Sequence, residues 1–215
     1  MTGTSSSVVS AGQSEIRDAA CVIVIDHSKP EPMLLMGRRH GDQVFLPDKW
    51  VFPGGRVDAA DRTLADTFDG PYVPHDLASA LRPFALAAVR ELSEETGLVI
   101  DADAAHRRYE CWPAFTATGY APAPVHLYPL ARAITPPGRV RRYDTWFFTA
   151  SRTAVADKQT APDGELLDLD WFTVDDARRL DLPNITRLVL DDVSARLHTI
   201  SPATDFPGCA LPSSE

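Results

Sequence analysis

The chain has 215 residues, of which 44% are hydrophobic and 24% charged, and its formal net charge at pH 7 is −9. This length and balance are typical of one globular domain with a full core. The negative charge argues against a nucleic-acid backbone or an anionic membrane as the main partner. The cysteines at positions 21, 111 and 209 are far apart and odd in number. We therefore expect reduced thiols in a cytoplasmic protein, without disulfides or a zinc site.

Both ends of the chain are polar. The first 19 residues have neither the basic start nor the apolar run of a signal peptide. No run of 18 apolar residues is present that would span a membrane. We therefore expect a flexible N-terminal segment over residues 1–19, a single domain over 20–200 and a C-terminal tail over 201–215.

Short apolar and β-branched runs open the domain. Residues 20–26 (ACVIVID) and 33–36 (MLLM) flank a turn that contains proline, so the sequence predicts a β-hairpin. A third short strand over 50–52 ends at a Pro-Gly-Gly turn over 53–55. Because glycine has no Cβ, this turn lets the backbone approach a ligand closely.

A helix is predicted to follow an insertion. Residues 62–82 contain turn-forming residues and predict an irregular excursion near the mouth of the site. Pro83 suits the first turn of a helix, and Gly97 suits the position just past its end. Apolar residues form one stripe of this helix. The neighbouring stripe holds three glutamates at i, i+3 and i+4, which are Glu91, Glu94 and Glu95.

The second half of the chain predicts more strands and two helices. Strands are expected over 125–131, 143–149 and 167–172. Thr173, with Asp176 three residues later, forms a capping-box pattern for a short helix, and an amphipathic helix should run over 184–198. Strands mixed with few helices predict an α/β protein with a mixed sheet and helices packed on its faces.

The three glutamates on one helical face repel one another by roughly 0.2–0.5 kcal/mol per pair. The E-x-x-E-E pattern alone is typical of a solvated helix face. Beside the glycine turn it equally suits a site where Mg²⁺ or Mn²⁺ takes hard oxygen ligands and shares its shell with a substrate phosphate. Such an ion lowers the pKa of a bound water and promotes hydrolysis. Arg90, four residues before Glu94, can pair with that carboxylate and hold it in position.

Residues 90–98 (RELSEETGL) resemble the second half of the Nudix box, R-E-U-x-E-E-x-G-U, in which U is aliphatic. Gly55, five further residues and Asp61 resemble the first half, G-x5-E, with aspartate in place of glutamate. The box normally has seven residues between that acid and the arginine. Here 28 residues (62–89) stand there, an insertion of 21. The resemblance covers roughly residues 20–180 and implies a Nudix-type α/β/α sandwich with a mixed β-sheet.

A narrower resemblance is to the Nudix branch with a long insert inside the box, which includes the peroxisomal coenzyme A diphosphatases. The segments that carry it are 45–47 (FLP), 50–61 (WVFPGGRVDAAD) and 142–148 (RYDTWFF). It implies hydrolysis of the diphosphate of a nucleoside diphosphate linked to another moiety, here coenzyme A or acyl-coenzyme A. The alternatives are a hydrolase of ADP-sugars or dinucleotides and a nucleotide-sensing Nudix module without catalysis. The intact set of three glutamates favours an enzyme.

The family pattern also implies a set of site residues and an Mg²⁺ or Mn²⁺ cofactor. Metal ligands are expected at Gly54, Asp61, Glu91, Glu94 and Glu95. Catalytic roles are expected for Arg90, Glu91, Glu94 and Glu165, with Asp163 as the competitor of Glu165. Substrate contacts are expected from Arg38, Arg39, Gly55 and Arg142, although a surface position is an equal alternative for Arg38 and Arg39. The expected partner is a small nucleotide diphosphate, with no nucleic acid and no membrane, and a homodimer is left open.

Overall fold

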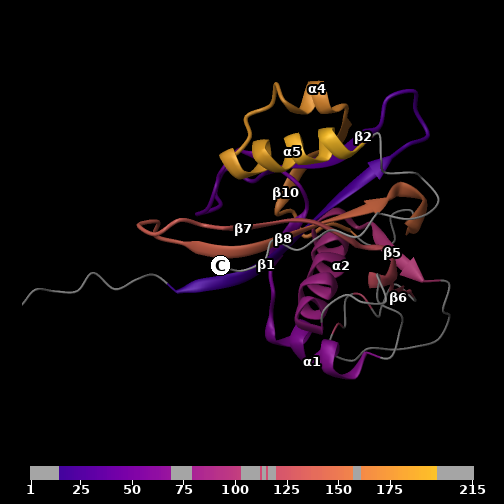
Figure 1. The fold of residues 1–215 in the computed structure, drawn as a ribbon, viewed down its shortest axis with the longest axis vertical. Helices are drawn as coiled ribbons and strands as arrows, with labels where there is room; N and C mark the ends of the chain where they lie inside the picture. Colours follow the sequence, from indigo (N-terminus) through magenta and orange to yellow (C-terminus); the bar gives the residue numbers. More distant parts are fainter. Residues whose placement is uncertain are drawn as a thin grey trace, which may run out of the picture.

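The computed structural model describes residues 15–68, 79–102, 112, 115, 120–156 and 161–197 (Figure 1). Its elements in chain order are β1 (Ile16–Asp26), β2 (Met33–Arg39), β3 (Trp50–Val51), β4 (Gly54–Arg56), α1 (Ala59–Thr67), η1 (Ser79–Leu81), α2 (Arg82–Thr96), β5 (Val99–Ala102), β6 (Ala121–Pro122), η2 (Pro124–His126), β7 (Tyr128–Ile134), β8 (Arg142–Ser151), η3 (Arg152–Ala154), β9 (Val155–Ala156), β10 (Leu166–Phe172), α4 (Val174–Ala177) and α5 (Asn184–Arg196). No helix in these ranges is long and apolar enough to cross a bilayer.

The central sheet is mixed. Its strands run in the order β10-β2-β1-β8-β7, with β3 paired to β2 and β4 paired to β1. β1 and β8 are parallel neighbours, whereas the other strand pairs described in this sheet are antiparallel. A smaller sheet has the order β6-β5-β9. The short β4, and with it the glycine turn, lies next to β1 because Gly54 pairs with Cys21 and Gly55 with Ala20.

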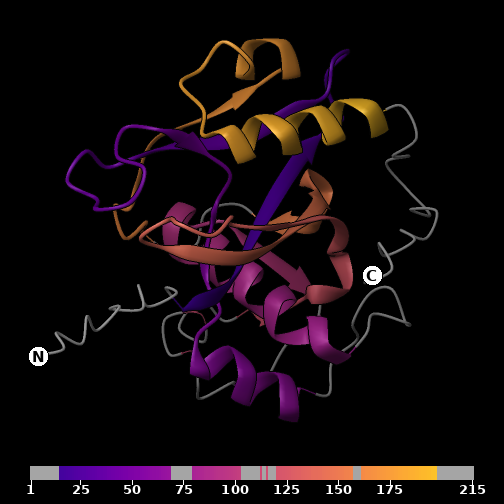
Figure 2. The same cartoon turned by 60° about the vertical axis from the view of Figure 1, so that its left-hand side comes forward.

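Two hydrophobic cores lie on opposite faces of the central sheet. On one face, α1 and α2 cover Val22 and Val24 of β1. On the other face, α4 and α5 cover Ile23 and Ile25 of the same strand. This alternation is the period of two expected of a strand that is buried on both sides. Figure 2 shows α5 on one side of the sheet and α1 with α2 on the other, so the predicted α/β/α sandwich is confirmed.

The elements with strong local signals are confirmed. β1 and β2 form the predicted antiparallel hairpin. α2 has proline in its first turn and ends at Gly97, whose φ of 73° is left-handed, as expected for a glycine just past a helix. Thr173 caps α4, because its side chain accepts a hydrogen bond from the backbone amide of Asp176.

Other boundaries differ from the predictions. β1 begins at Ile16, so residues 16–19 of the predicted N-terminal segment (1–19) belong to a strand, and residues 1–14 lie outside the described residues. The strand predicted over 125–131 begins later because residues 124–126 form a 3-10 turn. The first part of the insertion is not irregular, since α1 covers it with a capping box at its start. Residues 69–78 and 201–215 lie outside the described residues.

Candidate active site

The acidic face of α2 lies against the glycine turn of β4. Oε2 of Glu95 accepts a hydrogen bond from the backbone amide of Gly54 at 2.7 Å. A Cβ added to Gly55 would lie 2.5 Å from Cδ of Glu91, so a larger residue here would force this carboxylate to move. The structure therefore brings the two glycines together with Glu91 and Glu95.

Cys21 of β1 also lies at the turn. A Cβ added to Gly54 would lie 2.7 Å from its Sγ. Burial, together with the negative charges of Glu95 and Glu91, raises the pKa of the thiol well above its ordinary value. In the metal-free protein Cys21 therefore packs at the turn as a protonated thiol.

Arg90 is the centre of a buried ion-pair network. Its guanidinium donates from Nε to Oδ1 and from Nη2 to Oδ2 of Asp61, both at 2.9 Å. Nη1 donates to Oε2 of Glu94 at 2.8 Å and lies 3.0 Å from Oε1 of Glu91. Nη2 also donates to the carbonyl oxygen of Arg56 at 2.9 Å. Arg90 thus ties α1, β4 and the acidic face of α2 together, as its predicted pairing with Glu94 indicated.

Asp61 is the counter-ion of Arg90, a position different from the metal-ligand role expected from the sequence. Its side chain has no exposed surface. Oδ1 is bound by Arg90, and Oδ2 is bound by Arg90 and by the backbone amide of Asp58 at 2.8 Å. The latter bond is one half of the capping box of α1. With both oxygens engaged in this way, Asp61 does not face the glycine turn as a free ligand.

The glutamates of α2 share a partly buried, negative environment. Burial raises the pKa of Glu91 to about 7, with a further rise from Glu94 and an opposing effect of Arg90. Burial and the charge of Glu91 raise the pKa of Glu95 well above its ordinary value. Burial also raises the pKa of Glu94, again opposed by Arg90. These carboxylates ionise together most readily when a cation joins them.

A divalent cation fits this donor set chemically. Glu91 and Glu95 supply carboxylate oxygens beside the backbone of Gly54 and Gly55, and Mg²⁺ and Mn²⁺ prefer such oxygens. Within the described ranges, however, no three His, Cys, Asp or Glu side chains already converge as a metal site. We therefore expect a bound ion to draw the glutamates together and to complete its shell with water.

The two arginines at the end of β2 have different neighbours. Arg38 is bound by two partly exposed aspartates. Arg39 donates from Nε to the carbonyl oxygen of Phe45 at 3.0 Å. Burial and the charge of Glu91 raise the pKa of Glu95, and the positive charge of Arg39 lowers it by a smaller amount. Of the pair, Arg39 is the one beside the acidic face, as the alternation of side chains along a strand requires.

The loop before β10 places Asp163, rather than Glu165, next to α2. The backbone amide of Asp163 donates to the carbonyl oxygen of Glu94 at 2.8 Å. The pKa values of Glu94 and Glu95 are raised mainly by their own burial, and the negative charge of Asp163 raises them further. Oε2 of Glu165 instead accepts a hydrogen bond from Nε2 of Gln43 at 3.2 Å. The geometry therefore favours Asp163 where the sequence left both acids open.

Arg142 does not reach the glycine turn. It lies at the start of β8 and donates to the carbonyl oxygen of Thr135 at 3.1 Å. Its pairing partner on β1 is Ile16, whereas the partner of Gly54 is Cys21. Five residues along a strand correspond to about 16 Å. The expected substrate contact of Arg142 is therefore not supported by this arrangement.

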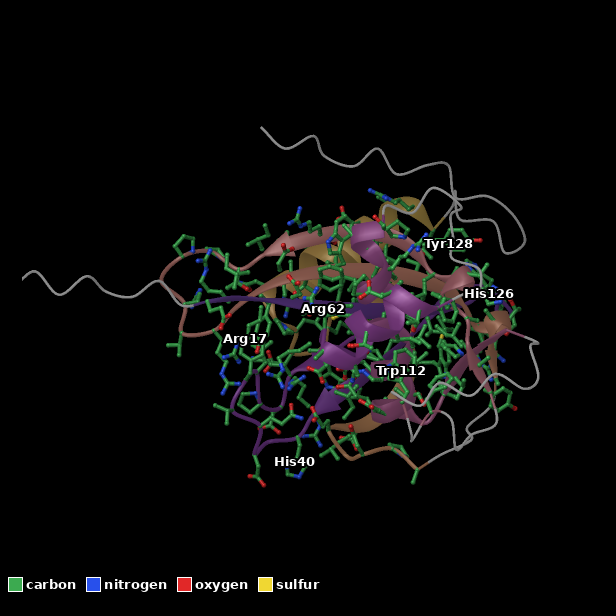
Figure 3. All side chains as sticks on the ribbon, turned by 90° about the horizontal axis from the view of Figure 1, so that it is seen from below. Arg17, His40, Arg62, Trp112, His126 and Tyr128 are labelled. Atoms are coloured by element: carbon green, nitrogen blue, oxygen red, sulfur yellow. The ribbon has the colours of Figure 1, made fainter. Side chains whose placement is uncertain are left out.

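Helix α1 is also held to the sheet from its outer side. Arg62 of α1, labelled in Figure 3, pairs with Asp18 of β1. The pairing is local to α1 and β1, and it does not involve the acidic face of α2. Together with the bond between Asp61 and Arg90, it fixes α1 between β1 and α2. The pairing could not be recognised in the sequence, because Asp18 and Arg62 are 44 positions apart and no local pattern links them.

The profile of the NUDIX domain matches residues 84–193. The chain belongs to the Nudix family. The matched range begins inside α2, after the glycine turn and the insertion that separates the two halves of the box. The family match, with Nudix hydrolases among similar structures, supports a hydrolase of diphosphate bonds in nucleoside diphosphate derivatives.

Several solved structures share the fold. A Nudix hydrolase from Alicyclobacillus acidocaldarius is 24% identical, with a TM-score of 0.63 over 88% of this chain and 99% of that one. The MutT protein from Methanosarcina mazei Go1 is 15% identical, with a TM-score of 0.52 over 85% and 95%. The Nudix domain of Shewanella oneidensis NrtR, complexed with ADP ribose, is 13% identical, with a TM-score of 0.50 over 85% and 89%. No curated protein matches the chain.

Proposed function

We propose that this Nudix protein is a divalent-metal-dependent diphosphatase that cleaves coenzyme A or acyl-coenzyme A. The observation that carries the chemistry is the position of Glu91 and Glu95 against Gly54 and Gly55. When bound, Mg²⁺ or Mn²⁺ would neutralise phosphate charge and lower the pKa of a coordinated water. The mutual repulsion of the two buried carboxylates supports such an ion.

The residues of the chain would orient the reactants. Arg90 holds Glu91 and Glu94 by direct contacts and is itself held by Asp61. In the metal-free protein the pKa of Glu91 is raised by burial to about 7. A bound divalent cation would lower this pKa and keep Glu91 ionised, so a carboxylate oxygen that the ion does not use could accept a proton from an attacking water. We therefore assign the role of general base to Glu91, with Glu94 and Asp163 as its nearest competitors.

The proposed reaction adds one water across the diphosphate. The water oxygen bonds to one phosphorus atom, and the bond from that phosphorus to the bridging oxygen breaks. One proton of the water passes to Glu91, and the bridging oxygen leaves on the other phosphate. Coenzyme A would give 3′,5′-ADP and 4′-phosphopantetheine.

The choice of coenzyme A rests on the branch resemblance in segments 45–47, 50–61 and 142–148. The structure adds support, because two of these segments meet. The rings of Phe45 and Tyr143 have centroids 5.3 Å apart, and Arg39 binds the carbonyl oxygen of Phe45. An aromatic surface next to a cation suits a ligand with a diphosphate and a long, weakly polar arm.

A substrate panel tests the assignment. We would measure kcat/KM for coenzyme A, ADP-ribose and NADH with Mg²⁺ and with Mn²⁺. ADP-ribose belongs in the panel because the NrtR domain was solved with it. The proposal expects coenzyme A to be the best of the three. If coenzyme A is cleaved tenfold worse than either of the others, a gap of about 1.4 kcal/mol, the substrate assignment is wrong.

A nucleotide sensor without catalysis is the alternative from another functional class. It would bind one compound of the panel and hydrolyse none, in either metal. The intact Glu91, Glu94 and Glu95 argue against it, because binding alone does not require a full set of metal ligands.

A further inference from the structure

Backbone strain marks the loop between β2 and β3. Among the described residues, three that are not glycine have a positive φ: Leu46 at 53°, Asp48 at 58° and Asp168 at 51°. Leu46 and Asp48 belong to residues 40–49, here named the β2–β3 loop, and Asp168 lies at the irregularity of β10. Residues with side chains hold this left-handed conformation where surrounding contacts fix it, which is frequent at functional sites.

Arg38 joins the two strained aspartates. Its guanidinium donates to Oδ2 of Asp168 from Nε at 2.8 Å and from Nη2 at 2.5 Å, and to Oδ1 of Asp48 from Nη1 at 3.0 Å. The side chain of Arg38 is 33% exposed, and those of Asp48 and Asp168 are 64% and 57% exposed. Ion pairs at such exposure contribute little to folding stability. The main consequence of this bridge is therefore geometric, since it fixes the end of the β2–β3 loop to β10.

The same loop follows Arg39, whose positive charge acts on Glu95 at the acidic face of α2. Nε of Arg39 donates to the carbonyl oxygen of Phe45, whose ring packs on Tyr143. Nε2 of Gln43 donates to the carbonyl oxygen of Glu165 at 3.1 Å. His40, labelled at the lower edge of Figure 3, begins the loop, and its amide donates to the same carbonyl oxygen at 3.1 Å. The loop is thus held by Arg39 next to Glu95 and by Arg38 at β10.

We propose that Arg38 is a positioning residue for substrate binding. By bridging Asp48 and Asp168 it fixes the β2–β3 loop, and with it Phe45 and Arg39, beside the acidic face of α2. The ligand that this loop would contact is the nucleoside diphosphate conjugate of the proposed function, on which the inference rests. Because Arg38 is engaged by the two carboxylates, we assign it this positioning role in place of the substrate contact expected from the sequence.

The molecule contains a matched control. Arg178, between α4 and α5, also bridges two aspartates, with Nη1 3.2 Å from Oδ1 of Asp175 and Nη2 2.9 Å from Oδ1 of Asp191. Its side chain is 42% exposed. It therefore reproduces the charge, the bridging and the exposure of Arg38 on the layer of helices that lies across the sheet from α2.

The first test compares Arg38→Gln with Arg178→Gln in steady-state kinetics on coenzyme A and on ADP-ribose. Arg38→Gln should raise KM at least about fivefold and lower kcat much less, because the loop loses its position while the reacting groups stay. Arg178→Gln should change KM less than twofold. An equal KM in Arg38→Gln and Arg178→Gln overturns the proposal.

Conservative and double variants separate positioning from a general structural effect. The KM of Arg38→Lys should lie between those of the wild type and Arg38→Gln, because an ammonium group cannot bridge two carboxylates with a rigid fork. The double variant Asp48→Asn, Asp168→Asn should reproduce Arg38→Gln, and adding Arg38→Gln to it should change KM little further. Full additivity of these substitutions overturns the proposal.

A second measurement does not depend on catalysis. Within the loop, the amides of Gln43 and Lys49 donate to the carbonyl oxygens of His40 and Leu46. Hydrogen exchange at these amides should be at least about tenfold faster in Arg38→Gln than in the wild-type chain, and unchanged in Arg178→Gln. Unchanged exchange in Arg38→Gln overturns the inference even if coenzyme A is hydrolysed. Conversely, a wild-type chain that hydrolyses no compound of the panel refutes the proposed function and leaves the exchange result to decide the role of Arg38 in the loop.

Discussion

Two arginines each gather carboxylates in this protein, and they do so under opposite conditions. Arg90 is buried and binds Asp61, Glu94 and Glu91 beneath the glycine turn. Arg38 is partly exposed and binds two aspartates at the β2–β3 loop. A buried charge without its partner costs several kcal/mol, on the order of 3–5, whereas an exposed pair is screened by water. Arg90 thus contributes to the stability of the folded core, whereas Arg38 fixes the β2–β3 loop.

Removing the buried arginine should have the largest effect on stability. Arg90→Gln leaves Asp61 buried without its counter-ion, so the free energy of unfolding should fall by about 3–5 kcal/mol. Urea unfolding at pH 7 measures this change. A loss no greater than that of Arg38→Gln would mean that burial does not distinguish the two arginines.

The pH dependence of the free energy of unfolding should reflect the raised pKa of Glu91. Its folded-state pKa of about 7 lies above its ordinary value of 4.5, so between these pH values the folded protein keeps a proton that the unfolded chain has lost. The free energy of unfolding should therefore fall as pH rises through this window, by at most about 3 kcal/mol.

The measurement compares metal-free wild-type protein with Glu91→Gln from pH 4 to pH 8. The variant lacks the titrating group, so its advantage in stability should grow with pH, and Mg²⁺ should stabilise the wild type more at pH 8 than at pH 5. The variant should also lose most of its activity. Parallel stability curves for the two proteins would contradict the assignment of Glu91.

Replacing Asp61 should lower the free energy of unfolding without lowering the affinity for Mn²⁺. Asp61→Asn should lower the free energy of unfolding by about 2 kcal/mol, less than Arg90→Gln, because Arg90 keeps Glu94 and Glu91 as partners. The affinity for Mn²⁺, measured by calorimetry, should change little. A loss of Mn²⁺ affinity comparable to that of Glu95→Gln would restore Asp61 to the metal ligands.

The smallest effect on stability is expected at the exposed bridge. Arg38→Gln should leave the urea midpoint close to that of the wild type, because solvent screens its ion pairs. The same should hold for Arg178→Gln. A marked fall in the midpoint for Arg38→Gln alone would mean that the β2–β3 loop contributes to the core, and its effect on KM would then reflect partial unfolding.

Local patterns predicted the parts of the site that lie close together in the sequence. The helix with its three glutamates, the glycine turn before it and the hairpin of β1 and β2 all follow from spacing and turn chemistry. The contact of Glu95 with Gly54 spans 41 positions. The sequence predicts both residues as metal ligands, because the family resemblance joins the glycine turn to the glutamates of the helix, but it does not specify this hydrogen bond.

For two expected site residues the structure shows other partners, and no local pattern encodes those pairs. Asp61 is separated from Arg90 by the insertion, and α1, which carries it, has weak helix formers such as aspartate and threonine. Its helix is stabilised by tertiary contacts, among them the burial of Leu64. Arg142 is expected at the site from the branch resemblance in residues 142–148. The register that places it five positions from the partner of Gly54 depends on how β1, β4 and β8 pair, which one strand does not encode.

The most direct test of the account is the position of the metal. Crystals soaked in Mn²⁺ should show an anomalous difference peak bound by the carboxylates of Glu91 and Glu95, next to the backbone of Gly54 and Gly55. Asp61 should stay paired with Arg90 in that structure. A peak elsewhere in the molecule, or one coordinated by Asp61, would contradict the account.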